Sequence, residues 1–133
     1  SAGAMSETWN SRLEDMIEIR DSVIASLGQG ENCSKAWDVG KSLADEMGHS
    51  ENLMGMQPDQ SSFLGHSVGL ELDETPVVAT GFDRPLPIGG TMAVEPKVIH
   101  HDGSIGNEDT WFRTSDGMEC LTAGDSFPMY TEW

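Results

Sequence analysis

The strongest constraint on the fold is a change in hydrophobic pattern near residue 60. Before it, apolar residues recur every three and four positions from about 6 to 27 and from about 34 to 47, which predicts two amphipathic helices. Gly28 and Gly48 follow these stretches and are typical helix ends. From Phe63 onward, short apolar pieces separated by turn residues predict strands. We therefore expect helices first and a sheet afterwards.

The clearest strand pattern runs from Thr91 to Ile99. Along it, Met92 and Val94 have one parity and Glu95 has the other, so we expect Glu95 on the sheet face opposite the helices. An Asp-Gly turn signal at Asp116 separates two later strand patterns. These further strands are expected at 105–114 and 118–121. The stretches 49–60 and 75–88 are expected to be mostly irregular or extended loop.

The charge of the chain limits its partners. With 23 acidic and 7 basic residues, the net charge is −16 over 133 residues, a length that fits one domain. Nucleic-acid binding needs a basic face, so nucleic acid is not an expected partner, and anionic membranes are disfavoured as well. No apolar run is long enough to cross a bilayer, so no membrane association is expected.

The ends and the cysteines suggest a cytoplasmic protein. Residues 1–5 lack the charged and apolar regions of a signal peptide, so we interpret them as a tag remnant and 6–133 as the domain. Cys33 and Cys120 provide no disulfide framework. We expect both to be free thiols in a reducing cell.

Three short motifs between Gly65 and Thr110 carry the candidate chemistry. They read G-H-S-V-G-L-E-L-D-E-T-P, E-P-K and G-N-E-D-T, and they contain His66, Glu95 and Glu108 in that order. One imidazole and two carboxylates form a ligand set suited to a divalent ion such as Mn, Fe, Co or Zn.

This stretch resembles the second half of the pita-bread metallopeptidases, the family of prolidase, aminopeptidase P, methionine aminopeptidase and creatinase. The spacing is most similar to that of prolidase. The family motifs are H-G-x-G-L-E-x-H-E-x-P, G-M-x-x-x-x-E-P-G and R-x-E-D-T, and Thr114 to Thr122 matches the closing hairpin T-x-D-G-x-E-x-L-T. The resemblance implies an α+β fold, half of a pita-bread domain, with two helices packed on a curved antiparallel sheet.

The resemblance also implies a function and its residues. His66, Glu95 and Glu108 would be metal ligands that converge on one point of the sheet, with Glu108 bridging two ions and Glu95 or a neighbouring acid moving protons. The full-length parent would hydrolyse dipeptides or amino-terminal X-Pro bonds, with Mn, Co, Fe or Zn as the cofactor. Peptides or other small molecules are therefore the expected substrates.

The family's other two ligands are Asp residues that precede the first helix, and this chain begins at that helix. We therefore expect an incomplete metal cage and an inactive fragment, whether the chain is a cut piece, a split-gene product or a remnant. Half a domain leaves a contact surface open. We accordingly expect a homodimer or pairing with an N-terminal half.

Three positions depart from the family motifs. Asp73 stands where the family has the substrate-contacting second His, and an ionised Asp accepts hydrogen bonds but does not donate them. Gly106 replaces the Arg of R-x-E-D-T, and Lys97 replaces the Gly after E-P. If the strand continues through Pro96, Lys97 lies on the same face of the sheet as Glu95. Three roles are open for it there: pairing with an acid, binding a substrate anion, or being simply an exposed Lys.

Two other functions stay open. The first alternative is a non-catalytic pita-bread module that works by binding, as in some histone chaperones. The second is a metalloenzyme of the same fold with a non-peptide substrate, creatinase-like or lyase-like. The retained trio favours an enzyme, whereas the changes at Asp73 and Gly106 favour a binding module. The adjacent His100 and His101 are expected to point to opposite faces of a strand and so not to form a metal pair.

Overall fold

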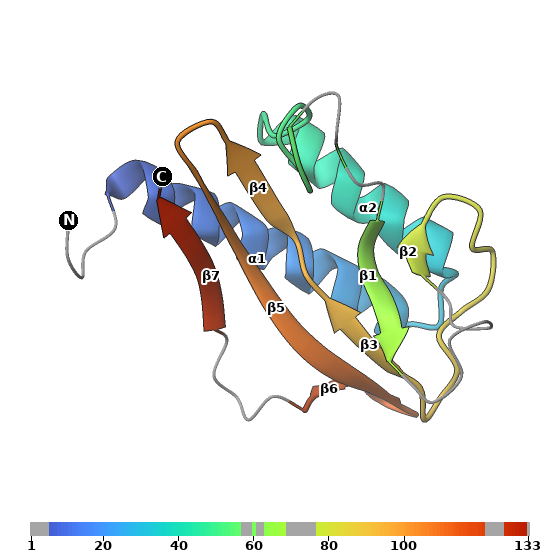
Figure 1. Ribbon diagram of the computed structural model, residues 1–133. Helices are drawn as coiled ribbons and strands as arrows, with labels where there is room; N and C mark the ends of the chain where they lie inside the picture. Colours follow the sequence, from blue (N-terminus) through green and yellow to red (C-terminus); the bar gives the residue numbers. More distant parts are fainter. Residues whose placement is uncertain (1–5, 57–59, 61–62, 69–76, 122–126, 133) are drawn as a thin grey trace.

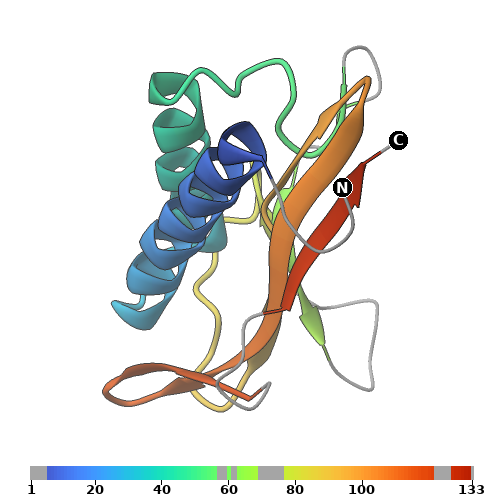
Figure 2. The same ribbon diagram turned by 90° about the vertical axis from the view of Figure 1, so that its left-hand side faces the viewer.

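Two helices pack against one face of a seven-stranded antiparallel sheet (Figures 1 and 2). The computed structural model describes residues 6–56, 60, 63–68, 77–121 and 127–132. The helices are α1 (Glu7–Gly28) and α2 (Cys33–Glu46), and the strands are β1 (Phe63–Val68), β2 (Val77–Ala79), β3 (Thr91–Val94), β4 (Lys97–His100), β5 (Gly103–Thr114), β6 (Gly117–Cys120) and β7 (Phe127–Glu132). The predicted α+β fold is confirmed.

The helices form where the sequence predicts them. The Ser6 side chain caps α1 by accepting a hydrogen bond from the Trp9 backbone N–H. Gly40 on α2 allows close packing on β1, because a Cβ there would lie only 2.5 Å from the Leu64 side chain. The two helices bury their apolar stripes against the sheet, with a core that includes Met16, Ile19, Val23, Leu27, Ala36 and Ala44.

Strand β5 is the centre of the sheet. Its first half is paired with β4 along one edge and with β7 along the other, and its second half is paired with β3 and β6 in the same way. From β3 the sheet continues through β1 to β2. All of these pairings are antiparallel. The two helices lie on one side of this sheet (Figure 2).

The segment predicted as one strand from 91 to 99 is divided into β3 and β4. Proline has no backbone N–H, so the chain cannot continue an uninterrupted ladder through Pro96. The Glu95 backbone N–H instead donates to the Leu64 carbonyl of β1, and the Pro96 carbonyl accepts from Asn107 of β5. The break therefore holds residue 95 between two neighbouring strands.

The parity predicted for this segment is correct. Met92, Val94, Val98 and Ile105 are fully buried beneath the helices. Two short elements were not predicted: β2 lies within the stretch expected to be loop, and β7 follows the last predicted strand. Cys33 and Cys120 are free thiols, as expected. No helix in the described ranges is long and apolar enough to cross a bilayer.

Candidate functional site

His66 lies on β1, on the face of the sheet away from the helices. In the register it is opposite Ala93 of β3, which is opposite Thr110 of β5, so the three residues share one face. The His66 side chain is 48% exposed, and its Nε2 lies 4.0 Å from Oε2 of Glu95. The imidazole is therefore next to the first predicted carboxylate and open to solvent.

Glu95 connects His66 to Glu108. Its backbone is held between β1 and β5 by the strand break at Pro96, and its side chain is 16% exposed. On its other side, the Glu95 carboxyl group shares a hydrogen bond with the carboxyl group of Glu108 on β5. The structure thus brings Glu95 together with both other predicted residues.

The negative charges of the two glutamates repel each other. The pKa of Glu95 is raised to about 7 from an ordinary 4.5: burial is the largest cause, the hydrogen bond and negative charge of Glu108 contribute, and Lys97 opposes the rise. At neutral pH the pair therefore retains part of a proton that an isolated glutamate would have released. A bound cation would relieve this repulsion between the two carboxylates.

The donor types suit a divalent metal, but the described residues are not arranged as a complete metal site. An imidazole and two carboxylates are ligands that Mn, Fe, Co and Zn accept. Within the residues that the structure describes, no group of three or more His, Cys, Asp or Glu side chains is arranged so as to hold a metal ion. The three residues therefore fit the chemistry of such an ion by donor type, and the described residues do not surround one. Asp73, the third predicted catalytic residue, lies outside the described residues.

Lys97 and Gly106 are direct partners in the β4–β5 register. A Cβ placed on Gly106 would collide with the Lys97 Cβ and would lie 2.6 Å from the Pro96 carbonyl oxygen. With Lys97 opposite, a side chain at 106 is strongly disfavoured. Two of the three departures from the family motifs therefore meet across one strand pair.

The opposite face of β5 carries a polar cluster that the sequence did not reveal. Arg20 of α1 donates to Oδ1 of Asn107 at 3.2 Å and lies 3.7 Å from Oδ2 of Asp109. Its guanidinium also lies 5.8 Å from the ring centre of Trp111, which packs against the core. The apolar stripe of α1 includes Arg20 by position, but nothing in the sequence identified the strand residues that it would meet.

His100 is separated from the candidate site. Its ring packs edge-on against Trp9 of α1, with ring centres 6.2 Å apart. Burial lowers the pKa of His100, and the positive charge of Arg12 lowers it further. The neighbouring His101 is exposed in the turn between β4 and β5.

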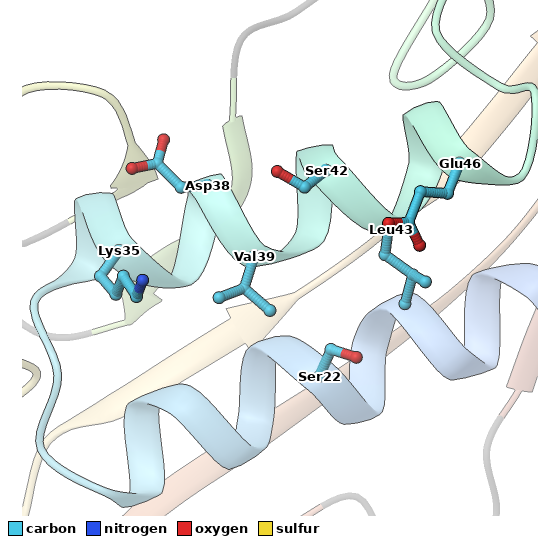
Figure 3. A pocket seen from close by; sticks show the side chains of 7 residues that line it. All are labelled: Ser22, Lys35, Asp38, Val39, Ser42, Leu43 and Glu46. Carbon is cyan, nitrogen blue, oxygen red and sulfur yellow. The ribbon is translucent and has the colours of Figure 1, made fainter.

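A groove lies on the helix layer, between α1 and α2 (Figure 3). Its volume is about 350 Å³. Its lining is Ser22, Lys35, Asp38, Val39, Ser42, Leu43 and Glu46. None of these is a residue predicted for the site, and the groove belongs to the other side of the molecule.

Comparison with known proteins identifies the family. The model of metallopeptidase family M24 matches residues 5–115. The Xaa-Pro dipeptidase of Pyrococcus horikoshii is 26% identical over 121 residues, which is 90% of this chain and 32% of that protein.

Solved structures show the same similarity. The prolidase of Pyrococcus horikoshii OT3 matches with a TM-score of 0.77 and 27% identity, over 92% of this chain and 34% of its own. An Xaa-Pro dipeptidase from Bacillus anthracis matches with a TM-score of 0.77 and 25% identity, over 96% of this chain and 34% of its own. The N-terminal domain of the FACT complex subunit SPT16 from chickpea (Cicer arietinum) shares the fold, with a TM-score of 0.72 and 16% identity, over 91% of this chain and 30% of its own.

This chain spans about a third of the length of the relatives that it matches. Its two helices on a curved antiparallel sheet are a portion of the pita-bread domain. Because the family model matches most of the sequence, the chain belongs to metallopeptidase family M24.

Proposed function

We propose that this chain is the C-terminal part of the catalytic domain of a prolidase-like metallopeptidase with two metal ions. Joined to an N-terminal half, it hydrolyses dipeptides or amino-terminal X-Pro bonds. On its own it is inactive, because its ligands form only part of a metal cage. The observation that supports this most directly is the contact of Glu95 with His66 on one side and Glu108 on the other.

Each residue has a role in this proposal. His66 offers an imidazole nitrogen from β1, and the glutamates at 95 and 108 offer carboxylate oxygens from the neighbouring strands. Bound ions of the Mn, Co, Fe or Zn type would polarise the scissile carbonyl and acidify a water molecule. Glu95 or a neighbouring acid would move protons during the reaction. In the metal-free chain the pKa of Glu95 is raised to about 7, so an ion that binds there at neutral pH would displace part of a proton. Asp73 would contact the substrate as a hydrogen-bond acceptor.

Zn²⁺ titration of the isolated chain by calorimetry tests the ligand assignment. We expect weak binding that is lost in His66→Ala, Glu95→Gln and Glu108→Gln. The exposed Glu119→Gln on β6 is the matched control, and it should bind Zn²⁺ like the unchanged chain. Equal binding by a triple variant at residues 66, 95 and 108 would refute the assignment.

A peptidase assay tests the reaction. The metal-loaded chain alone should show little turnover of an X-Pro dipeptide, and a protein that also contains the N-terminal half of the domain should be active. Strong turnover by the isolated chain would contradict the incomplete cage. A substrate panel that includes creatine separates peptide hydrolysis from a same-fold enzyme with a non-peptide substrate.

A binding module without catalysis is the alternative. The fold is shared with the N-terminal domain of a FACT complex subunit, and Asp73 and Gly106 depart from the peptidase motifs. If the longer protein holds no metal ion by elemental analysis, this alternative replaces the peptidase proposal.

Assembly is part of the proposal. Among the described elements, no helix covers the sheet face that carries His66 (Figure 2). We expect this face or a sheet edge to meet an N-terminal half, or a second copy of the chain. Sedimentation that shows a monomer at high concentration would argue against self-association.

A further inference from the structure

Lys97 lies on the same face of the sheet as the acidic pair. Its neighbour on β4, Val98, is fully buried beneath the helices, so Lys97 has the opposite orientation. Its cross-strand partner Gly106 is two positions before Glu108 on β5 and therefore shares the face of Glu108. The ammonium group is thus carried by the strand that follows Glu95 and lies beside the strand that carries Glu108.

Lys97 is the basic residue that β4 places on the face of this acidic pair. The chain contains 7 Lys and Arg residues, all of them in the described ranges. Four of the others have partners elsewhere: Arg12 lies over Trp9, Arg20 contacts Asp21 and Asn107, Lys41 pairs with Asp45, and Arg113 donates to the Leu86 carbonyl. Lys35 is on α2, and Arg84 lies between β2 and β3. No ion pair to Lys97 is found in the part of the chain that the structure describes.

The space at Gly106 explains why the cation comes from β4. Besides the collision with the Lys97 Cβ, a Cβ at 106 would lie 2.8 Å from the Lys97 Cα and 2.6 Å from the Pro96 oxygen. Side chains at both positions therefore exclude each other. Because 106 is glycine, the Lys97 Cβ lies against bare β5 backbone, and the lysine side chain leaves β4 on the face that carries both carboxyl groups.

We propose that Lys97 determines specificity by binding a carboxylate group of the ligand that occupies the face formed by His66, Glu95 and Glu108. That the ligand is a peptide rests on the proposed function, whereas the preference for a carboxylate rests on the position of Lys97. A lysine offers a single compact positive charge, which matches a monoanion. A phosphate dianion would be repelled more strongly by the two glutamates.

Ligand titrations of the whole 133-residue chain by NMR test this assignment. The probes are glycyl-proline and its C-terminal amide, each titrated with and without Zn²⁺, and the measured quantity is the ratio of their dissociation constants. Lys97→Met removes the charge and keeps the stem, and we expect it to reduce the preference for the free carboxylate about fivefold. Lys97→Arg should retain the preference.

Lys41→Met is the matched control. It removes the same charge from the exposed face of α2, where Lys41 pairs with Asp45, so it reports the effect of net charge alone. We expect it to leave the ratio unchanged. An equal loss in Lys41→Met and Lys97→Met, or no loss in Lys97→Met, would overturn the proposal. Inorganic phosphate that binds as well as glycyl-proline, and depends on Lys97, would overturn the assignment to a carboxylate.

An exchange of the two side chains provides a second test. Lys97→Gly alone should lose the preference, and Lys97→Gly combined with Gly106→Arg should regain it, because the cation is then presented from β5 at the same register position. The exchanged chain is expected to melt at a lower temperature, since the Pro96 oxygen still crowds residue 106. If it does not fold, the Met and Arg variants at 97 decide the question.

These outcomes separate the inference from the proposed function. If Zn²⁺ does not bind but Lys97→Met still abolishes the carboxylate preference, the metal assignment fails and the role of Lys97 stands. If Zn²⁺ binds through His66 and the glutamates while the Lys97 variants change nothing, the role of Lys97 fails and the metal assignment stands.

Discussion

The two faces of β5 give two neighbouring acids opposite electrostatic environments. Asp109 faces α1, where it is 1% exposed and has the guanidinium of Arg20 at 3.7 Å. Glu108 faces the open side, where it is exposed and shares a hydrogen bond with Glu95. The helix side compensates its acid within the chain, whereas the open side leaves two acids in mutual repulsion. A face that stabilises the fold and a face that is suited to a cationic ligand are thus built on consecutive residues of one strand.

Removal of the helix-side cation should have the largest effect. Arg20→Met leaves Asp109 buried without its nearby positive charge, and we expect the free energy of unfolding to fall by about 3–5 kcal/mol. Urea denaturation measures this loss. Lys41→Met breaks an exposed pair and should cost less than about 1 kcal/mol. If the two variants lose equal stability, the contrast between buried and exposed acids is wrong.

The raised pKa of Glu95 on the open face should make the stability of the chain depend on pH. The folded pKa of Glu95 is about 7 and its ordinary value is 4.5, so the folded state favours protonated Glu95. The resulting stabilisation is complete below pH 4.5 and is lost as the pH rises through about 7. The difference between the two pKa values corresponds to about 3 kcal/mol in the free energy of unfolding of the metal-free chain.

Glu95→Gln should remove this part of the pH dependence. Unfolding free energies of both chains between pH 4 and pH 8.5 would be compared, because other acids contribute equally to each. Parallel curves for the two chains would show that Glu95 titrates normally and that the open face is not strained.

The third and smallest effect concerns the spacing between β4 and β5. Gly106→Ala places a methyl group against Lys97 and the Pro96 oxygen, and we expect a loss of about 1–3 kcal/mol in unfolding free energy. In a Lys97→Gly background, the loss caused by Gly106→Ala should be smaller, because the closest contact is gone. A double-mutant cycle with zero coupling would contradict the mutual exclusion of side chains at 97 and 106.

The sequence predicted the elements whose residues carry periodic patterns. The stripes of α1 and α2 and the alternation of Met92 and Val94 placed the core correctly, because burial of apolar side chains follows these periods. The break at Pro96 and the short β2 were not predicted, since both depend on pairing with β1 rather than on local pattern. The family resemblance, confirmed by the family model, was carried by spaced motifs.

The sequence proposed the residues of the candidate site and did not reveal their geometry. His66, Glu95 and Glu108 were chosen from their motifs, and Glu95 lies beside both of the others. The pairing of Lys97 with Gly106 required the strand register, because the two residues are brought together only by the turn between β4 and β5. The cluster around Arg20 required the packing of α1 on β5, which joins residues 87 positions apart in the chain.

The four partners of β5 have a consequence for how the chain opens. Because β3, β4, β6 and β7 all exchange backbone hydrogen bonds with this single strand, its amides are enclosed by neighbours along both edges. Hydrogen exchange at the middle of β5 should therefore require global unfolding and report the full stability of the chain, whereas β2 at the rim should exchange through local fraying.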